Sequence, residues 1–229
     1  MDFHLSILPN EFTLRPQGGI NLKDFLNFIE TNYSQNKFFY YWDSDGTVVT
    51  PESPQIEWVQ NGATKVVFKL KNFPSEVIKI PLKGYLNDLN ETVPMKNYCE
   101  IEFKNYQIAQ QMGVHNFLSP IKKITNQFYT QKLIVKDLFG QPMTVDQKIL
   151  KWFNDRKLIE ITKQINAAAT LTLFKEQYSL MELKKFNSFL EKTQINDLTN
   201  ENFCLDINNK IVLFDYSGYK GDSSNDSLL

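Results

Sequence analysis

The sequence has few of the residues on which several common kinds of functional site depend. Its 229 residues include only two histidines, His4 and His115, and two cysteines, Cys99 and Cys204. Two widely separated cysteines cannot form a disulfide framework, and their separation does not resemble a zinc site. Two histidines are too few for a multi-histidine metal centre and leave little material for a His-based triad. The chemistry must therefore be sought among carboxylates, amides, lysines and hydroxyls.

Neither sign of charge is in excess. Lysine and arginine number 25 and the acidic residues 26, for a formal net charge of −1, which removes the usual electrostatic case for nucleic-acid binding. No apolar run is long enough for a membrane-spanning helix, and the first residues do not resemble a secretory signal. We therefore expect a globular, cytoplasmic protein without a transmembrane segment. With 42% hydrophobic residues it can bury a substantial core.

The middle of the chain shows β-strand patterns. Three short β-rich segments, Ile56–Val59, Lys65–Leu70 and Glu76–Ile80, are separated by turn residues and predict an antiparallel meander. Residues 97–112 follow as a predicted helix, with Gly113 as its C-cap. Its expected apolar stripe consists of Ile101, Ile108, Ala109 and Met112. Two further strands are predicted at Ile121–Ile124 and Phe128–Leu138.

The pattern becomes helical after residue 144. Helical spacing of apolar residues extends through residues 146–192, with Asp146 and Ser179 as expected N-caps. A final hairpin is predicted from Phe203–Leu205 and Ile211–Phe214. The fold class is therefore α+β. We expect three parts: an N-terminal extension of a helix and a hairpin (1–55), a β-rich lobe (56–138) and a reduced helical lobe (139–229).

The richest candidate site lies around the final hairpin. A polar loop presents Asp197 and, five residues later, Asn202, and the hairpin then returns the chain to Asp215. These side chains can converge, because a hairpin folds the chain back beside its own start. Two oxygen ligands for Mg²⁺ and a carboxylate that orients a hydroxyl are what phosphoryl transfer needs.

These residues resemble the protein-kinase family. Asp197 and Asn202 match the spacing of its catalytic loop, and Asp215-Tyr216-Ser217, with Gly218 next, is similar to its metal-binding DFG motif. Upstream, Val77-Ile78-Lys79 resembles the strand lysine that holds the α- and β-phosphates of ATP. The resemblance implies an ion pair between Lys79 and a carboxylate of the next helix, Glu102 rather than its rival Glu100. It also implies a two-lobed fold and an adenine-binding hinge that includes Lys136 and Leu138.

The chain also departs from the family pattern. Gly62 is the only glycine kept from the phosphate-binding loop, and Ile195-Asn196 replaces the usual His-Arg before the catalytic aspartate. Thr199 stands where a lysine is common, and only eleven residues follow Gly218, too few for an activation segment. These departures are similar to those of minimal effector kinases of pathogenic bacteria, which implies a cytoplasmic protein or one delivered to a host cytosol.

The resemblance implies an ATP- and Mg²⁺-dependent phosphotransferase. Asp197 and Lys79 would be catalytic, Asn202 and Asp215 would bind the metal, and Gly62, Glu102, Lys136 and Leu138 would complete the nucleotide site. The expected acceptor is a protein hydroxyl, although a small molecule stays open, and residues 1–55 could recruit a host or partner protein. The alternative within the same fold is an inactive pseudokinase that serves as a scaffold.

A second resemblance points to a different chemistry. Asp43-Ser-Asp45-Gly-Thr47 follows an apolar aromatic run and resembles the first motif of haloacid-dehalogenase-like phosphatases, and residues 221–226 resemble their acidic Mg²⁺ motif. In that family Asp43 would be the nucleophile and Asp45 the general acid/base. The resemblance implies a parallel α/β sheet, whereas residues 56–80 predict an antiparallel one.

Overall fold

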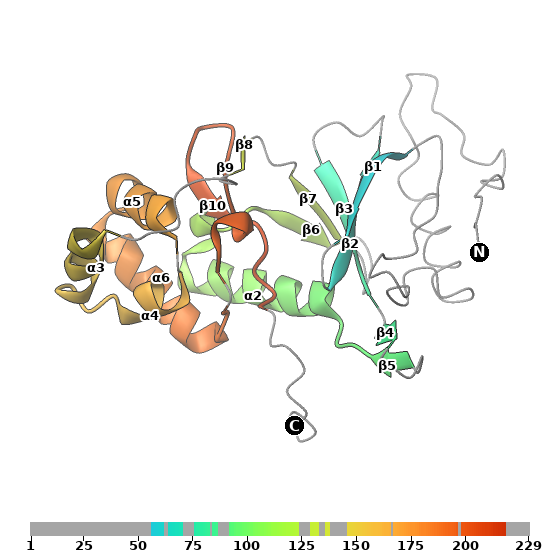
Figure 1. The fold of residues 1–229 in the computed structure, drawn as a ribbon, viewed down its shortest axis with the longest axis horizontal. Helices are drawn as coiled ribbons and strands as arrows, with labels where there is room; N and C mark the ends of the chain where they lie inside the picture. The colour runs from blue at the N-terminus through green and yellow to red at the C-terminus, as the bar shows by residue number, and fades with distance from the viewer. Residues whose placement is uncertain are drawn as a thin grey trace. The chain divides into compact units, whose positions relative to one another are not determined.

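The computed structural model describes ten stretches of the chain: residues 56–61, 64–70, 76–82, 84–86, 92–123, 129–132, 136–137, 146–165, 167–196 and 198–218. The architecture is mixed α+β with antiparallel sheets, as the sequence predicts (Figure 1). The chain divides into two compact units. The first contains residues 1–100 and 122–133, and the second contains residues 101–121 and 134–229. The predicted extension, residues 1–55, lies outside the described residues.

A five-stranded sheet, antiparallel in its β1–β2, β2–β3 and β3–β7 pairs, dominates the first unit. Its order is β1-β2-β3-β7-β6, and the predicted meander forms its first three strands. The strands are β1 (Ile56–Asn61), β2 (Lys65–Leu70), β3 (Glu76–Pro81), β6 (Ile121–Lys123) and β7 (Tyr129–Lys132). The register pairs Val67 with Lys79 and Lys79 with Tyr129, so Lys79 lies on a central strand. The strand that carries the predicted phosphate-binding lysine is therefore held on both sides.

The two faces of this sheet differ in chemistry. One face of β2 and β3 presents Val66, Phe68, Ile78 and Ile80, all fully buried. Alternation along the strands places the three lysines of β2 and β3, Lys65, Lys69 and Lys79, on the opposite face, and these are also buried. A second, two-stranded antiparallel sheet pairs β4 (Gly84–Leu86) with β5 (Thr92–Pro94), and the sequence patterns did not predict it.

Helix α2 (Tyr98–Met112) confirms the helix predicted for this region. Its end is a Schellman motif, in which the Gly113 amide donates to Gln110 O and the Val114 amide to Ala109 O. Gly113 has a φ of +67°, which glycine adopts without the steric cost that a Cβ brings. A 3₁₀ turn, η1 (His115–Phe117), follows directly.

Besides most of α2, the described part of the second unit contains four helices. They are α3 (Gln147–Asn154), α4 (Ile159–Gln164), α5 (Ala168–Gln177) and α6 (Leu180–Thr193). Asp146 caps α3 by accepting from the Lys148 amide, and Ser179 forms a capping box with Glu182 at the start of α6. Both predicted N-caps are thus confirmed. A three-stranded antiparallel sheet completes the unit in the order β10 (Ile211–Leu213), β9 (Phe203–Leu205) and β8 (Lys136–Asp137).

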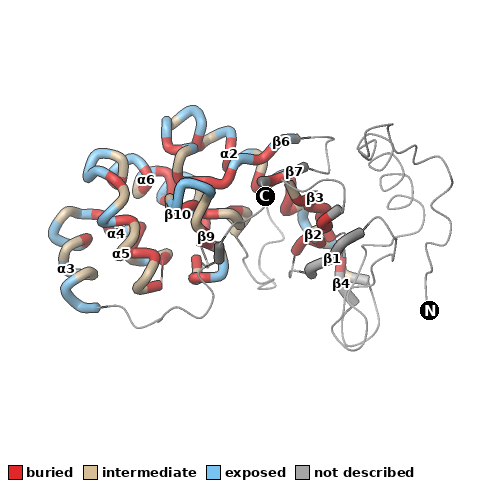
Figure 2. Tube along the Cα trace, turned by 90° about the horizontal axis from the view of Figure 1, so that it is seen from above, coloured by how far each residue is buried: buried red, intermediate tan, exposed pale blue. Residues whose placement is uncertain are grey.

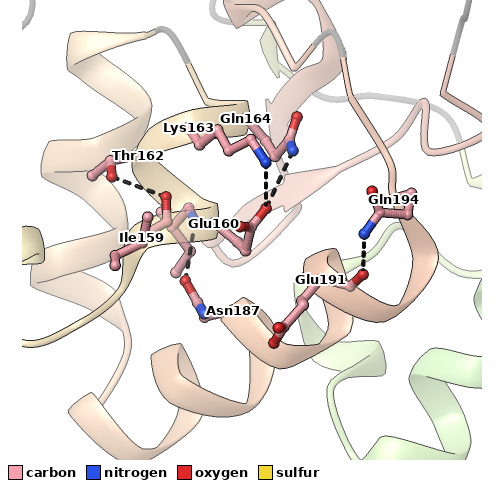
Figure 3. Close-up of polar contacts among 9 residues, drawn as sticks. Ile159, Glu160, Thr162, Lys163, Gln164, Asn187, Glu191 and Gln194 are labelled. Carbon is pink, nitrogen blue, oxygen red and sulfur yellow. Dashed lines mark hydrogen bonds and ion pairs between the residues drawn. The ribbon is translucent and has the colours of Figure 1, made fainter.

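Helix α4 is attached to α6 through its first turn (Figure 3). The Asn187 side chain accepts from the Ile161 amide at 3.2 Å, which satisfies a donor that the helix itself leaves unused. Within α4 the Glu160 carboxylate accepts from the Gln164 amide at 3.3 Å and pairs with Lys163 at 3.7 Å. These contacts fix a helix of only six residues that is too short to be stable alone.

Aromatic rings form the centre of the second unit. Phe117 lies between Tyr178 and Phe186, with ring centroids 3.8 and 4.4 Å away and nearly parallel planes. We call this group, completed by Phe174, Phe189 and Phe203, the aromatic cluster; its rings come from η1, α5, α6 and β9. In Figure 2 the buried positions recur along these same elements. The cluster therefore joins the helices to the hairpin.

One strand prediction was wrong. The sequence indicated a continuous strand over Phe128–Leu138, but β7 ends at Lys132 and pairs with β3, whereas β8 pairs with β9 in a different sheet. A run of β-forming residues does not reveal that the chain changes its pairing partner within it. Among the described residues, none of the helices has the length and apolar character needed to cross a bilayer.

We expect the capping box of α6 to make stability depend on pH. Hydrogen bonds from the Ser179 amide and then from its hydroxyl hold the pKa of Glu182 below the usual value of a glutamate. A lowered folded-state pKa gives stability that is present above the unfolded-state pKa and lost as the pH falls through the folded-state pKa. Glu182→Gln should therefore cost about 0.3–1 kcal/mol at neutral pH, and the difference from wild type should shrink as the pH falls from about 5 to about 3.

Urea denaturation at several pH values measures this difference. Glu191→Gln, near the end of the same helix, is the matched control, because a carboxylate there does not interact favourably with the helix dipole. A Glu182→Gln deficit that stays constant down to about pH 3 would contradict the assignment.

Candidate active site

The loop between α6 and β9 is held at several points. Gln194 ends α6 in a left-handed conformation, with a φ of +54°. Leu198 is buried and forms a bridge with Ile165, at the end of α4. From α5, the Thr170 hydroxyl donates to Asn200 Oδ1 at 3.2 Å, and both side chains are buried. Helices α4 and α5 thus support the loop on which the sequence placed a catalytic aspartate.

Asn202 is joined to the segment that carries Asp215. It ends a 3₁₀ turn, η2 (Asn200–Asn202), immediately before β9. Its carbonyl oxygen accepts from the amide of Phe214 at 2.9 Å, and Asp215 is the next residue. The hairpin therefore returns the chain beside its own start, as the sequence predicted.

The Asn202 side chain already has two donors. Its Oδ1 accepts from the Thr199 amide at 3.0 Å and from the Thr199 hydroxyl at 2.9 Å. A carbonyl oxygen has two lone pairs, so both are engaged within the η2 turn. The amide oxygen that was predicted to bind a metal thus also serves as a cap of its own loop.

The Asp215–Gly218 segment is fastened to α2 and to the chain after it. The Tyr216 carbonyl accepts from the Asn105 side chain at 2.8 Å, and the Tyr216 hydroxyl donates to Ser119 O at 3.0 Å. The fully buried Tyr216 ring also stacks on Tyr106, 6.3 Å between centroids. Burial raises the pKa of the Tyr106 hydroxyl, so this ring stays neutral in the physiological range. The half-buried Asp215 carboxylate accepts from the Ser217 hydroxyl at 3.1 Å.

Gly218 brings the end of this segment against the start of the loop. Its φ is +68°, and a Cβ built there would lie 3.5 Å from Ile195 Cα and from Asn196 Oδ1. That oxygen is buried and makes no hydrogen bond within the described part of the chain. Residues 195–196 directly precede Asp197, so both ends of the 196–202 loop contact the chain that follows β10.

The buried face of α2 is more polar than the sequence predicted. Only Ala109 of the expected stripe is fully buried, whereas Ile101, Ile108 and Met112 are partly exposed. The buried face carries Tyr98, Cys99, Glu102, Asn105, Tyr106 and Ala109. Glu102 is fully buried on the same face as Tyr106 and Ala109, as expected from the helical spacing, while Glu100 is exposed. Asn105 donates to the Tyr216 carbonyl. A purely apolar helix face could not make this hydrogen bond.

Two residues at the end of α5 clamp the hairpin. The Gln177 side chain accepts from the Ile211 amide at 2.7 Å and donates to Asn209 O at 3.0 Å. The Tyr178 hydroxyl donates to Ile211 O at 2.7 Å. Burial, followed by the nearby carboxylates of Glu182 and Asp206, raises the pKa of Tyr178, which keeps this donor protonated. The hairpin that ends near Asp215 is therefore fixed by side-chain contacts as well as by its own ladder.

Several predicted site residues lie elsewhere. Lys79 is buried in β3 of the first unit, and its pairing with Glu102 stays a prediction. For Lys136 the structure describes the backbone, which pairs with Leu205. Asp197, Gly62 and Leu138 lie outside the described residues, as do Asp43 and Asp45.

The donor set fits a hard cation such as Mg²⁺. Asp215 and Asn202 offer oxygen atoms on two segments that a backbone hydrogen bond joins. Mg²⁺ is commonly held by one or two carboxylates, with water and phosphate oxygens completing its shell. The described residues contain no group of three or more His, Cys, Asp or Glu side chains that could enclose a metal. A site in the described residues would thus depend on ligands from a bound phosphate compound.

The sequence reasoning missed the residues that support the site. Asn105, Ser119, Thr170, Gln177 and Thr199 bind carbonyls, amides or side chains that are distant along the chain or lie in an unrecognised turn. Only Thr199 had a readable signal, because Thr-x-x-Asn has the spacing of a capping box. Comparisons of the chain with protein-family models, curated proteins and solved structures find no match.

We expect the Tyr216 hydroxyl to stabilise the fold measurably. Tyr216→Phe removes the hydrogen bond to Ser119 O and should lower the free energy of unfolding by about 1 kcal/mol, measured by urea denaturation. Tyr106→Phe is the control, because its hydroxyl makes no hydrogen bond within the described residues while its ring contact is retained. Equal losses in the two variants would show that the Tyr216 hydroxyl does not hold this segment.

Proposed function

We propose that the chain is an ATP- and Mg²⁺-dependent phosphotransferase, an atypical minimal kinase that acts on a protein hydroxyl. One observation carries the proposal: the Asp215–Gly218 segment is held both by α2 and by the loop that includes Asn202. The buried Glu102 lies on that same helix, one turn before Asn105. A carboxylate segment, a helix with a buried acid and an Asp/Asn loop are thus parts of one unit.

Each residue has a distinct role in this proposal. Asp215 and Asn202 hold the magnesium ion, which neutralises charge on the transferred phosphate, and Asp197 orients the acceptor hydroxyl. Lys79, paired with Glu102, holds the phosphates, with Gly62 in the loop above them and Lys136 and Leu138 beside the adenine. Lys79 is 3% exposed and Glu102 fully buried. A buried charge needs a compensating partner, and each of the two side chains makes interactions in the structure; that they pair with each other is part of the proposal.

A pseudokinase is the second candidate, and the Asn202 side chain favours it. Because Oδ1 accepts two hydrogen bonds from Thr199, one must break before the oxygen can bind a metal. A scaffold protein could keep this arrangement permanently. Nucleotide binding without phosphate transfer distinguishes a scaffold from an active enzyme.

The phosphatase hypothesis gains no support from the described residues. The pairs β1–β2, β2–β3, β3–β7, β4–β5, β8–β9 and β9–β10 are all antiparallel, whereas the resemblance implies a parallel sheet. Asp43 and Asp45 lie outside the described residues. A phosphatase would hydrolyse phosphate esters without any nucleotide.

Transfer of label from γ-labelled ATP tests the proposal. With Mg²⁺ and host-cell lysate, the wild-type chain should label a protein, and Asp215→Ala should reduce the rate at least about a hundredfold because charge on the phosphate is no longer neutralised. Asp43→Ala is the control and should retain activity.

Four outcomes separate the candidates. Transfer lost in Asp215→Ala but kept in Asp43→Ala supports the kinase. No transfer, with ATP still raising the melting temperature of wild type, supports the pseudokinase. Neither transfer nor a thermal shift would contradict the proposed site, and loss of phosphate-ester hydrolysis in Asp43→Ala would establish the phosphatase.

A further inference from the structure

We propose that Thr199 controls the affinity of the cation site by competing with the cation for Asn202 Oδ1. The inference rests on the proposed function, because it concerns the same metal site. It assigns a role to a residue that stands where the kinase pattern has a lysine. In this role Thr199 is a positioning residue that acts through Asn202.

The competition follows from the count of lone pairs. Asn202 Oδ1 accepts from the amide and from the hydroxyl of Thr199, at 3.0 and 2.9 Å. A carbonyl oxygen offers two lone pairs, so a third, strong ligand must displace one donor. The amide is fixed by the backbone, whereas the hydroxyl can rotate away. The Thr199 hydroxyl is therefore the donor that a cation displaces.

The rest of the turn stays in place when the hydroxyl leaves. The Asn202 amide donates to Thr199 O at 3.1 Å, and the Asn202 carbonyl accepts from Phe214 at 2.9 Å. Asn200 is tied separately to Thr170 on α5. Rotation of the hydroxyl proton alone, with its oxygen still accepting from the Asn202 amide, thus frees a lone pair of Asn202 Oδ1 without moving the loop away from Asp215. The hydrogen bond from the Thr199 hydroxyl therefore occupies Asn202 Oδ1 until a cation displaces it. We call this hydrogen bond the Thr199 lock.

The lock also separates the two uses of Asn202. In the capping box of η2 the Thr199 hydroxyl oxygen accepts from the Asn202 backbone amide, and Asn202 Oδ1 accepts from the Thr199 amide. The hydroxyl proton adds a second hydrogen bond to the same Oδ1, which stabilises the loop further. With the hydroxyl displaced, the same oxygen faces a positive ion. Removal of the hydroxyl alone should therefore weaken the loop in the absence of cation and strengthen cation binding. A purely structural role for Thr199 predicts only the first effect.

Thr199→Val tests the lock, because valine keeps the branched shape and lacks the hydroxyl. Mn²⁺, which binds the same hard oxygen ligands as Mg²⁺, is titrated into the full-length protein with a fixed concentration of ADP. Free Mn²⁺ is followed by electron paramagnetic resonance. We expect binding about three- to tenfold tighter than in wild type, the change that one net hydrogen bond makes to an equilibrium constant. Thr199→Ser, which keeps the hydroxyl, is the matched control and should bind like wild type.

A double-mutant cycle distinguishes competition for Asn202 Oδ1 from a purely structural role of Thr199. Asn202→Ala should weaken Mn²⁺ binding, and in its background Thr199→Val should no longer change the affinity. The melting temperature should fall in Thr199→Val without cation and rise more on Mn²⁺ addition than it does in wild type. A Thr199→Val effect that persists with Asn202→Ala would overturn the inference.

Asp215→Ala separates failure of the lock from failure of the proposed site. If Asp215→Ala abolishes Mn²⁺ binding while Thr199→Val binds no more tightly than wild type, the lock is wrong and the metal site stands. If wild type binds no Mn²⁺, or Asp215→Ala binds it equally well, the proposed metal site is wrong and the lock with it.

Discussion

The stacking of Phe117 between Tyr178 and Phe186 is the contact on which the candidate site depends. Phe117 ends the η1 turn, so its position sets the path of the next two residues. Leu118 forms a bridge with Leu213, the Ser119 amide donates to Leu213 O at 2.8 Å, and the Ser119 carbonyl accepts from Tyr216. Asp215 lies between those two attachment points. The stacking of Phe117 in the core thus helps to place Asp215, which lies far from it in the sequence and does not contact it directly.

Hydrogen bonds to backbone carbonyls do the remaining positioning. The Asn105 side chain donates to the Tyr216 carbonyl, and the Tyr178 hydroxyl donates to the Ile211 carbonyl. The backbone amide of Phe214 donates to the Asn202 carbonyl. Because these bonds hold main-chain atoms, the side chains of Asp215 and Asn202 are placed by their own segments, and both accept from a nearby hydroxyl, that of Ser217 and that of Thr199. Both groups are thus pre-oriented by interactions that a cation or a phosphate can replace, which suits a site that opens on binding.

Local rules predicted most of the fold and fewer of the contacts. Strands β2 and β9 have the bounds that the sequence indicated, and Asp146 and Ser179 cap their helices, because alternation and capping are encoded within a few residues. The split of the predicted 128–138 strand between two sheets depends on strands that are distant along the chain, β3 for one part and β9 for the other. In the site, the hairpin returns the chain beside its start as predicted, with a backbone hydrogen bond from Phe214 to Asn202, whereas Asn105 and Gln177 hold carbonyls that no sequence pattern specifies.

The burial of Glu102 is difficult to explain by packing alone. The carboxylate is fully buried on the face of α2 that also carries Asn105, Tyr106 and Ala109. Removing a charged group from water costs several kcal/mol, and replacing a buried charged group together with its partner by apolar residues of similar volume is often neutral or stabilising. A helix that had only to pack would therefore be served at least as well by an apolar residue at position 102, with an apolar residue in place of its partner. Sequences depart from the most stable choice chiefly at functional sites. The buried carboxylate, one turn from the side chain that fastens the Asp215 segment, thus supports the proposal that α2 contributes to a binding site.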